Sequence, residues 1–509
     1  MAGRVNISEE LAAGLTFAYN AMNNTTGINI KGGTWNVKDF GANSANNNYA
    51  LAVGAGVGFS KEGLALNGAV GLNLGTNSTK SILDDLTMTG IKTLKVTATD
   101  NTSKTTVAGN VNISKDGTVA LGGSGGKSKI SASGSTSLNY INNSAKTLVE
   151  NANVKADKNF GVVAQSDEKI ANYAGAVDVD VNGSIGVSVA YNEIKGNTDA
   201  LVKNSKLEVG GSTAKDDLIA ISNPKDNLID DFVTKNNWTS GRLMSGRKSD
   251  KKSGLVVNSS ATHSISSDLA TIGIRASSDS PGVGVSGAVN INKIGGATTS
   301  RIQDSEVGIQ DSANPRHLTS DTYVNAADFT NNGSFIGNAA VSGTVAVGVL
   351  WNENKIERET NSLVKGGTLN VKNLDVKADS RQGLSNLNIA VGAGFAANKS
   401  QVFAAASGDN IVRNQMEGTT TAKIENATVN HSGNVNVDAY HKDDIYATNI
   451  GIGAAIDTGS VGATFDLGYG LTRENSTVEA EINNSTLKSK VGAVNVNAEK
   501  QLNKRFLLR

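Results

Sequence analysis

One short phrase recurs along this chain and constrains its fold more than any other feature. A run of Thr, Ala and Leu leads into Asn-Ser or Asn-Ala, then a second short run, a Gly or Lys turn, and finally V-x-V-x-A. Its closing alanine serves as a register mark, and successive marks lie 52 to 66 residues apart. The marks are Ala98 and Ala164, then Ala326, Ala378, Ala439 and Ala498. Self-similarity at a near-constant period predicts a solenoid, in which each unit buries its apolar face against its neighbours.

Composition excludes several classes of protein. Only 5% of the residues are aromatic and 57 are glycine, so small and β-branched side chains must fill the core, which suits stacked thin strands. The 47 basic and 47 acidic residues give a net charge of zero, so we expect no nucleic-acid partner. The absence of cysteine excludes disulfides, thiolate zinc sites and cysteine nucleophiles.

Between the repeated phrases lie pairs of Gly-alternating strands around polar turns, as in residues 50–75 and 449–470. Alternation with a period of two predicts strand, turn and strand, because glycine at every second position disfavours a helix. We expect a unit of about 60 residues to hold three β-helix coils of about 20 residues each. Some 25 coils at a spacing of about 4.8 Å would make a rod of about 120 Å. Asn142–Asn143, Asn426 and Asn483–Asn484 are expected to form side-chain ladders at the corners.

The alternation divides the chain into four parts. We predict solenoid repeats over residues 1–205, an insertion over 206–260, further repeats over 261–500, and a non-repeat tail over 501–509. The insertion contains Pro224, and a short helix is expected at residues 227–234. A smaller insertion is expected around Pro315 and His317. Insertions in a solenoid project from one face, which is often the binding face.

The insertion carries a basic cluster that is the candidate contact site for a partner. As a functional site it could bind heparan sulphate, sialylated glycans or acidic lipid, or it could form a protease-sensitive linker. The alternative is a solvated loop with no partner. The cluster comprises Arg242, Arg247, Lys248, Lys251 and Lys252, with Trp238 beside it.

No pattern argues for catalysis, a cofactor or a metal site. The four histidines (His263, His317, His431 and His441) are scattered and fit no metal-ligand spacing. Asp178 and Asp180 share one face of a strand and could hold Ca²⁺, although the simpler interpretation is a solvated strand face. His441 begins the sequence HKDD, which we interpret as a hydrophilic turn. Residues 339–350 have the length of a membrane-spanning strand but suit a solenoid core better, because both faces are small and apolar.

The repeated phrase resembles a known family. It is clearest as TTAKIENATVNHSGNVNVDA at residues 420–439 and as STVEAEINNSTLKSKVGAVNVNAE at residues 476–499. The pattern T-x-A-x-I-x-N-S-x-L followed by G-x-V-x-V-x-A is similar to that of the leukotoxin-like filamentous adhesins of fusobacteria, which are related in design to filamentous haemagglutinin. The resemblance implies an all-β, right-handed parallel β-helix. It also implies export through an outer-membrane partner and adhesion or toxicity toward host cells, notably leukocytes.

These observations lead to one expected function and two alternatives. We expect a segment of a secreted or surface-displayed bacterial leukotoxin or adhesin that contacts a receptor or glycan on leukocytes or epithelial cells. The first residues show no signal peptide, so we expect the chain to be an internal fragment. The alternatives are an inert spacer and a polysaccharide lyase, in which Asp178, Asp180 and a basic residue of a neighbouring coil would converge in a surface groove.

Overall fold

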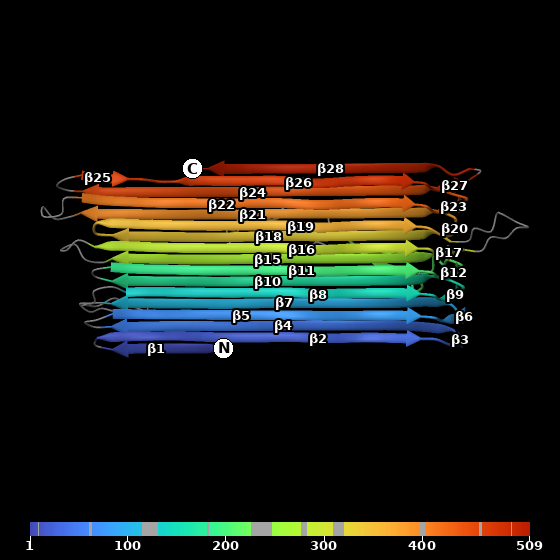
Figure 1. Ribbon diagram of the computed structural model, residues 1–509, viewed down its shortest axis with the longest axis horizontal. Coiled ribbons are helices and arrows are strands. Elements are labelled where there is room, and N and C mark those ends of the chain that lie inside the picture. Colours follow the sequence, from blue (N-terminus) through green and yellow to red (C-terminus); the bar gives the residue numbers. More distant parts are fainter. Residues whose placement is uncertain are drawn as a thin grey trace, which may run out of the picture.

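The computed structural model describes residues 1–8, 10–60, 64–114, 131–180, 183–224, 247–275, 282–308, 320–396, 403–457, 461–489 and 491–508. Within them the chain is a parallel β-helix with three sheets, and no helix long and apolar enough to cross a membrane is present. Figure 1 shows the strands of successive coils stacked in sequence order, from the blue N-terminal coil to the red C-terminal one. The predicted all-β solenoid is confirmed. The predicted helix at residues 227–234 and the smaller insertion around Pro315 and His317 lie outside the described residues.

Two sheets of long strands enclose the core, and a third sheet of short strands closes one edge. Sheet A contains β1 Ala2–Ser8, β4 Asp39–Ser60, β7 Thr93–Ser114, β10 Phe160–Asp180, β15 Leu255–Arg275, β18 Thr322–Ser342, β21 Leu374–Ala396, β24 Val435–Asp457 and β28 Val494–Leu508. Sheet B contains β2 Leu11–Lys31, β5 Leu64–Asp84, β8 Ser131–Glu150, β11 Gly183–Lys203, β16 Val283–Gln303, β19 Val345–Lys365, β22 Phe403–Glu425, β25 Val461–Thr464 and β26 Gly468–Asn483. Sheet C contains β3 Thr34–Asn36, β6 Thr87–Ile91, β9 Asn153–Ala156, β12 Lys206–Val209, β17 Glu306–Val307, β20 Thr368–Val371, β23 Thr428–His431 and β27 Thr486–Lys488.

The repeat unit is one coil, so the expected three coils per unit are wrong. Each coil runs through one strand of sheet A, one of sheet B and one of sheet C, and then stacks on the next coil. The register marks confirm the stacking: Ala98 pairs with Ala164, and the alanines from Ala326 to Ala498 pair in turn. At about 3.3 Å per residue a strand of 21 residues is about 70 Å long, whereas nine stacked strands span only about 40 Å. The molecule is therefore wider than it is tall (Figure 1).

Each Gly-alternating pair consists of the end of one long strand and the start of the next, and the two do not form a hairpin. Residues 50–60 finish β4 in sheet A, and residues 64–75 begin β5 in sheet B. These strands face each other across the core and hydrogen-bond to neighbouring coils instead of to each other. Inward-facing glycines let the sheets approach closely here, since a Cβ on Gly392 would lie 2.2 Å from the Ser407 carbonyl oxygen. Close approach explains the alternation that the sequence shows.

The predicted boundaries of the insertion and the tail are corrected by strand pairing. Residues 206–209 form β12 of sheet C, and residues 255–260 begin β15 of sheet A, so the insertion is confined to residues 210–254. Its described part contains the antiparallel strands β13 Ile219–Pro224 and β14 Arg247–Lys252. Residues 501–508 are no separate tail, because they continue β28 and pair with β24.

The core consists of bands that run parallel to the stacking direction. An apolar band of Leu, Val, Ile and Ala lies beside sheet C. A polar band with ionisable groups follows, then an isoleucine-rich band, a band of asparagines, and finally a band of small residues at the far edge. Because a strand places every second residue inward, each band repeats one inward position in every coil.

The asparagine band is a ladder of hydrogen bonds between coils. Each side-chain amide donates to the carbonyl oxygen of its equivalent in the next coil at 2.8 to 3.1 Å. The ladder runs through Asn20, Asn73, Asn139, Asn192, Asn292, Asn354 and Asn414. The predicted ladders therefore exist, but chiefly inside the core; Asn143, predicted for a corner, also faces inward and bonds Asn77 at 3.0 Å. At the corners, Asn426 and Asn484 have φ of 53° and 45°, the left-handed backbone that asparagine tolerates.

We predict that Asn192→Ala lowers the free energy of unfolding by about 2 kcal/mol, because it leaves the Asn139 amide and the Asn292 carbonyl oxygen without their partner. Urea unfolding followed by circular dichroism measures this. Asn475→Ala is the matched control on the exposed face of β26 and should change stability by less than about 0.5 kcal/mol. Equal effects of the two substitutions would contradict the role of the ladder.

Candidate functional site

The insertion hairpin of β13 and β14 lies against the outer face of sheet A. Ile219 and Ile221 on β13 are 2% and 4% exposed. They pack against Val256, with Val163 and Tyr323 beside them. The hairpin is therefore held on the β-helix by an apolar contact of its own, separate from the main core.

Gly161 on β10 makes room for this contact. A Cβ at this position would lie 2.8 Å from the Ile219 side chain, which real Cβ atoms essentially never do. Gly109 faces the same side from β7, and nothing lies within 4 Å of the Cβ position there. The hairpin therefore fills the space outside Gly161, whereas the space outside Gly109 is open.

Asn159, immediately before β10, ties both ends of the insertion together. Its amide donates to the carbonyl oxygens of Ser212 and Asp217, both at 2.9 Å. Its carbonyl oxygen accepts from the backbone N–H of Ser212 at 2.8 Å and of Gly254 at 2.7 Å. Asp217 also pairs with Lys158 at 2.7 Å. The sequence analysis missed Asn159, although asparagine at the equivalent positions 373 and 434 marks it as a corner residue.

A groove of 430 Å³ runs between the hairpin and sheet A. It is lined by Lys95, Thr97 and Thr99 of β7, Gly161, Val163 and Gln165 of β10, and Lys215, Asp216, Leu218, Ile219, Ala220 and Lys251 of the insertion. Three lysines against one aspartate give the lining a local positive charge on a chain whose net charge is zero. Clefts lined by one sign of charge concentrate ligands of the opposite sign.

The predicted basic cluster is only partly gathered at this groove. Lys251 lines it, whereas Lys252 pairs with Asp250 at 2.9 Å and lies 5.2 Å from the centre of the Tyr323 ring. The backbones of Arg247 and Lys248 pair with β13. Trp238 and Arg242 lie outside the described residues. The sequence analysis missed Lys95, which lies far from the insertion along the chain, and Lys215, which lies within the predicted insertion but outside its basic cluster.

We expect Gly161→Val to displace the hairpin, since its side chain would collide with Ile219. Hydrogen exchange at β13 and β14 should become faster, while exchange in β15 and β18 stays slow. Gly109→Val adds the same side chain where space is open, so it should leave the hairpin protected. If both variants behave alike, the hairpin is not held by the contact with Gly161.

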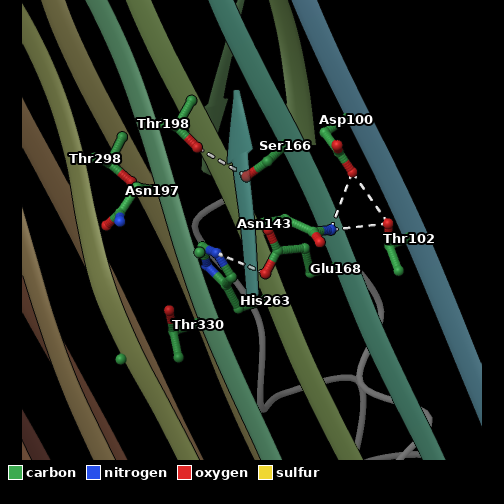
Figure 2. Close-up of polar contacts among 12 residues, drawn as sticks. Asp100, Thr102, Asn143, Ser166, Glu168, Asn197, Thr198, His263, Thr298 and Thr330 are labelled. Carbon is green, nitrogen blue, oxygen red and sulfur yellow. Dashed lines mark hydrogen bonds and ion pairs between the residues drawn. The ribbon is translucent and has the colours of Figure 1, made fainter. Parts of the chain in front are cut away.

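The polar band of the core is the second place where ionisable and hydrogen-bonding side chains gather (Figure 2). Asp100 accepts hydrogen bonds from Thr79, Thr102 and Asn143, each at 3.0 Å. In the same band, Ser166 and Thr198 bond across the core at 2.8 Å. Burial raises the pKa of Asp100, against the lowering effect of the hydrogen bonds from Thr79, Thr102 and Asn46.

Glu168 and His263 meet in the centre of this band. His263 Nε2 lies 3.6 Å from Glu168 Oε2, and both side chains are fully enclosed (Figure 2). Glycine at position 196 leaves the space for them, since a Cβ there would lie 2.4 Å from His263 Nε2. Burial, with the nearby Asp100 adding to it, raises the pKa of Glu168 to about 8, so this carboxyl keeps its proton at neutral pH.

Two further enclosed pairs complete the band. Arg358 bonds Asp328 at 2.6 Å and also donates to the carbonyl oxygens of Gly196 and Gly295. Burial raises the pKa of Asp328, but the charge of Arg358, together with His263 and the hydrogen bonds from Arg358 and Thr298, lowers it below its ordinary value. His441 lies 2.9 Å from Asp443 inside β24, so the turn predicted at HKDD is wrong.

Asp178 and Asp180 also lie inside the core, so their interpretation as a solvated strand face is wrong. Both are fully buried near the end of β10. Asp178 accepts hydrogen bonds from Ser131 and from the backbone N–H of Ile185. Arg275 of the next coil pairs in register with Asp180. Within the described parts of the chain, no three His, Cys, Asp or Glu side chains group as metal ligands.

We predict that Glu168 makes folding stability fall as the pH rises. Its carboxyl releases a proton near 4.5 when exposed and near 8 when folded, so between these values the folded state binds more protons than the unfolded state. Glu168→Gln should remove this loss, and its advantage in thermal midpoint over the unchanged chain should grow from pH 5 to pH 8. Glu306→Gln, at a surface ion pair, is the control and should give no such trend. An advantage that stays constant with pH would refute the assignment.

Comparison of the chain with protein-family models, with curated proteins and with solved structures gave no match.

Proposed function

We propose that this chain is a non-enzymatic segment of a secreted or surface-displayed bacterial leukotoxin or adhesin that contacts host cells through the outer surface of its β-helix. The observation that carries the proposal is the basic groove beneath the insertion hairpin. Lys95, Lys215 and Lys251 line it against Asp216, on a scaffold whose ionisable core groups are enclosed. An anionic group on a leukocyte or epithelial glycan or receptor is the partner that this charge suits.

The fold and composition support the same proposal. A parallel β-helix presents long, regular outer faces, and the repeated phrase resembles that of exported filamentous adhesins. The chain contains no cysteine. We also propose that the full-length protein is exported through an outer-membrane secretion partner.

The alternatives find less support. The lyase hypothesis needs Asp178, Asp180 and a basic residue in a surface groove, but the residues that meet, including Arg275, are buried. The spacer hypothesis does not account for a hairpin that is fixed at its base by Asn159 and packed to leave a charged groove.

The test is binding of the folded chain to leukocytes, measured by flow cytometry and followed by viability. We expect saturable binding that weakens about tenfold when Lys95, Lys215 and Lys251 are replaced by Glu. Replacing Lys38, Lys372 and Lys488 by Glu changes the net charge equally at exposed sites outside the groove and should leave binding intact.

The outcomes separate the hypotheses. Death of the bound cells identifies a toxin, and binding without death identifies an adhesin. Equal losses in the two triple variants would show a general charge effect rather than groove binding. No saturable binding by the unchanged chain would contradict the proposal and favour a spacer.

A further inference from the structure

A second hollow lies on the outer face of sheet A, next to the basic groove. It measures 250 Å³ and is lined by Asn47, Asn48 and Tyr49 of β4, Asn101, Thr102 and Ser103 of β7, and Asp167 and Lys169 of β10. Its volume is below the range of about 300 to 1,000 Å³ that is usual for drug-sized ligands, so it suits one ring of a larger molecule. One Asp and one Lys leave its lining without net charge.

Tyr49 is the aromatic wall of this hollow. It is 64% exposed, which leaves much of its ring available to a ligand. Large aromatic side chains are more often buried. An exposed one beside polar groups offers a flat apolar surface that is bordered by hydrogen-bonding side chains. The C–H groups on one face of a pyranose ring pack well on such a surface.

The polar wall offers donors and acceptors that the protein does not use. The Asn101 amide donates to Asn47 Oδ1 at 2.8 Å, which leaves the Asn47 NH₂ and the Asn101 carbonyl oxygen without a side-chain partner among the described residues. Asp167 Oδ2 pairs with Lys169 Nζ at 3.1 Å, and Asp167 Oδ1 is enclosed by protein atoms, so neither oxygen serves as the acceptor for a ligand here.

Sugar hydroxyls match this arrangement, because each hydroxyl both donates and accepts. Adjacent hydroxyls on one ring could receive a hydrogen bond from Asn47 and donate to the Asn101 carbonyl oxygen while the ring stacks on Tyr49. We propose that this hollow binds a neutral sugar residue of a carbohydrate chain, stacked on Tyr49 and hydrogen-bonded by Asn47 and Asn101.

The hollow lies beside the basic groove on the same face. Thr99 and Gln165 of the groove lie two residues before Asn101 and Asp167 on the same strands, which is a distance of about 7 Å. A glycan can therefore place a charged residue in the groove and a neutral one on Tyr49. The hollow itself requires no charge on its ligand, so this proposal can hold even if contact with host cells through the groove fails.

The test uses six neutral probes: lactose, N-acetyllactosamine, N,N′,N″-triacetylchitotriose, cellotriose, maltotriose and xylotriose. Each is titrated into the full chain at millimolar concentration and followed by saturation-transfer NMR and calorimetry. We expect at least one to bind. Tyr49→Ala should weaken that binding about tenfold, Asn47→Ala should weaken it several-fold, and Tyr49→Phe should retain it because the ring remains.

Tyr173→Ala is the matched control, because Tyr173 is a 44% exposed tyrosine on the same face outside the hollow. It should bind as the unchanged chain does. The triple lysine-to-glutamate groove variant should also keep neutral-sugar binding, which separates this site from the proposed cell-contact groove. Failure of all six probes to bind would overturn the proposal, and so would binding that Tyr49→Ala leaves unchanged.

Discussion

The fold depends on side chains that can hydrogen-bond to copies of themselves. A primary amide carries both a donor and an acceptor, so an asparagine can accept from the coil on one side and donate to the coil on the other. The seven-membered column from Asn20 to Asn414 uses both capacities at almost every step. A charged group cannot repeat in this way, because identical charges would stack about 4.8 Å apart. The sequence therefore repeats because each side chain of the ladder must lie on an identical side chain in the next coil.

Ionisable groups in the core obey the same constraint by alternating along their band. In register, Asp100 pairs with Ser166, Glu168 lies between Thr102 and His263, and Asp328 pairs with Ala261, so none of these carboxyls stacks directly on another carboxyl. Arg358 reaches across from sheet B and neutralises Asp328. Among the described residues Glu168 makes no side-chain hydrogen bond and lies 3.6 Å from His263, and it keeps its proton instead. A buried carboxylate in this band is therefore either paired with a cation, as Asp328 is with Arg358, or protonated and uncharged, as Glu168 is.

The sequence predicts the class of fold and the stacking register, but not the number of coils. The closing alanines mark equivalent positions correctly because the phrase surrounds a single corner and the start of a strand. The coil count failed because strands of 21 residues are far longer than the usual 3 to 10, so one strand looks like two. Turn signals such as Asn182-Gly183 also favour a hairpin, whereas the strands on either side, β10 and β11, belong to different sheets. The groove was partly missed for a different reason: Lys95 and Lys251 come together only through packing of the insertion on sheet A.

The spacing of the ladder also governs the order in which such a chain can fold. Bonded asparagines lie 53 to 66 residues apart in most coils and 100 apart across the insertion, so a long strand has no partner until the next coil exists. Closing the first loop of this kind is the slow, nucleating event, and every later coil adds to an edge that is already formed. The entropic cost of closing a loop grows only with the logarithm of its length. The insertion therefore raises the free-energy cost of closing its coil by only about 0.6 kcal/mol. A chain that becomes available gradually from one end could therefore fold one coil at a time, each finished coil serving as the template for the next.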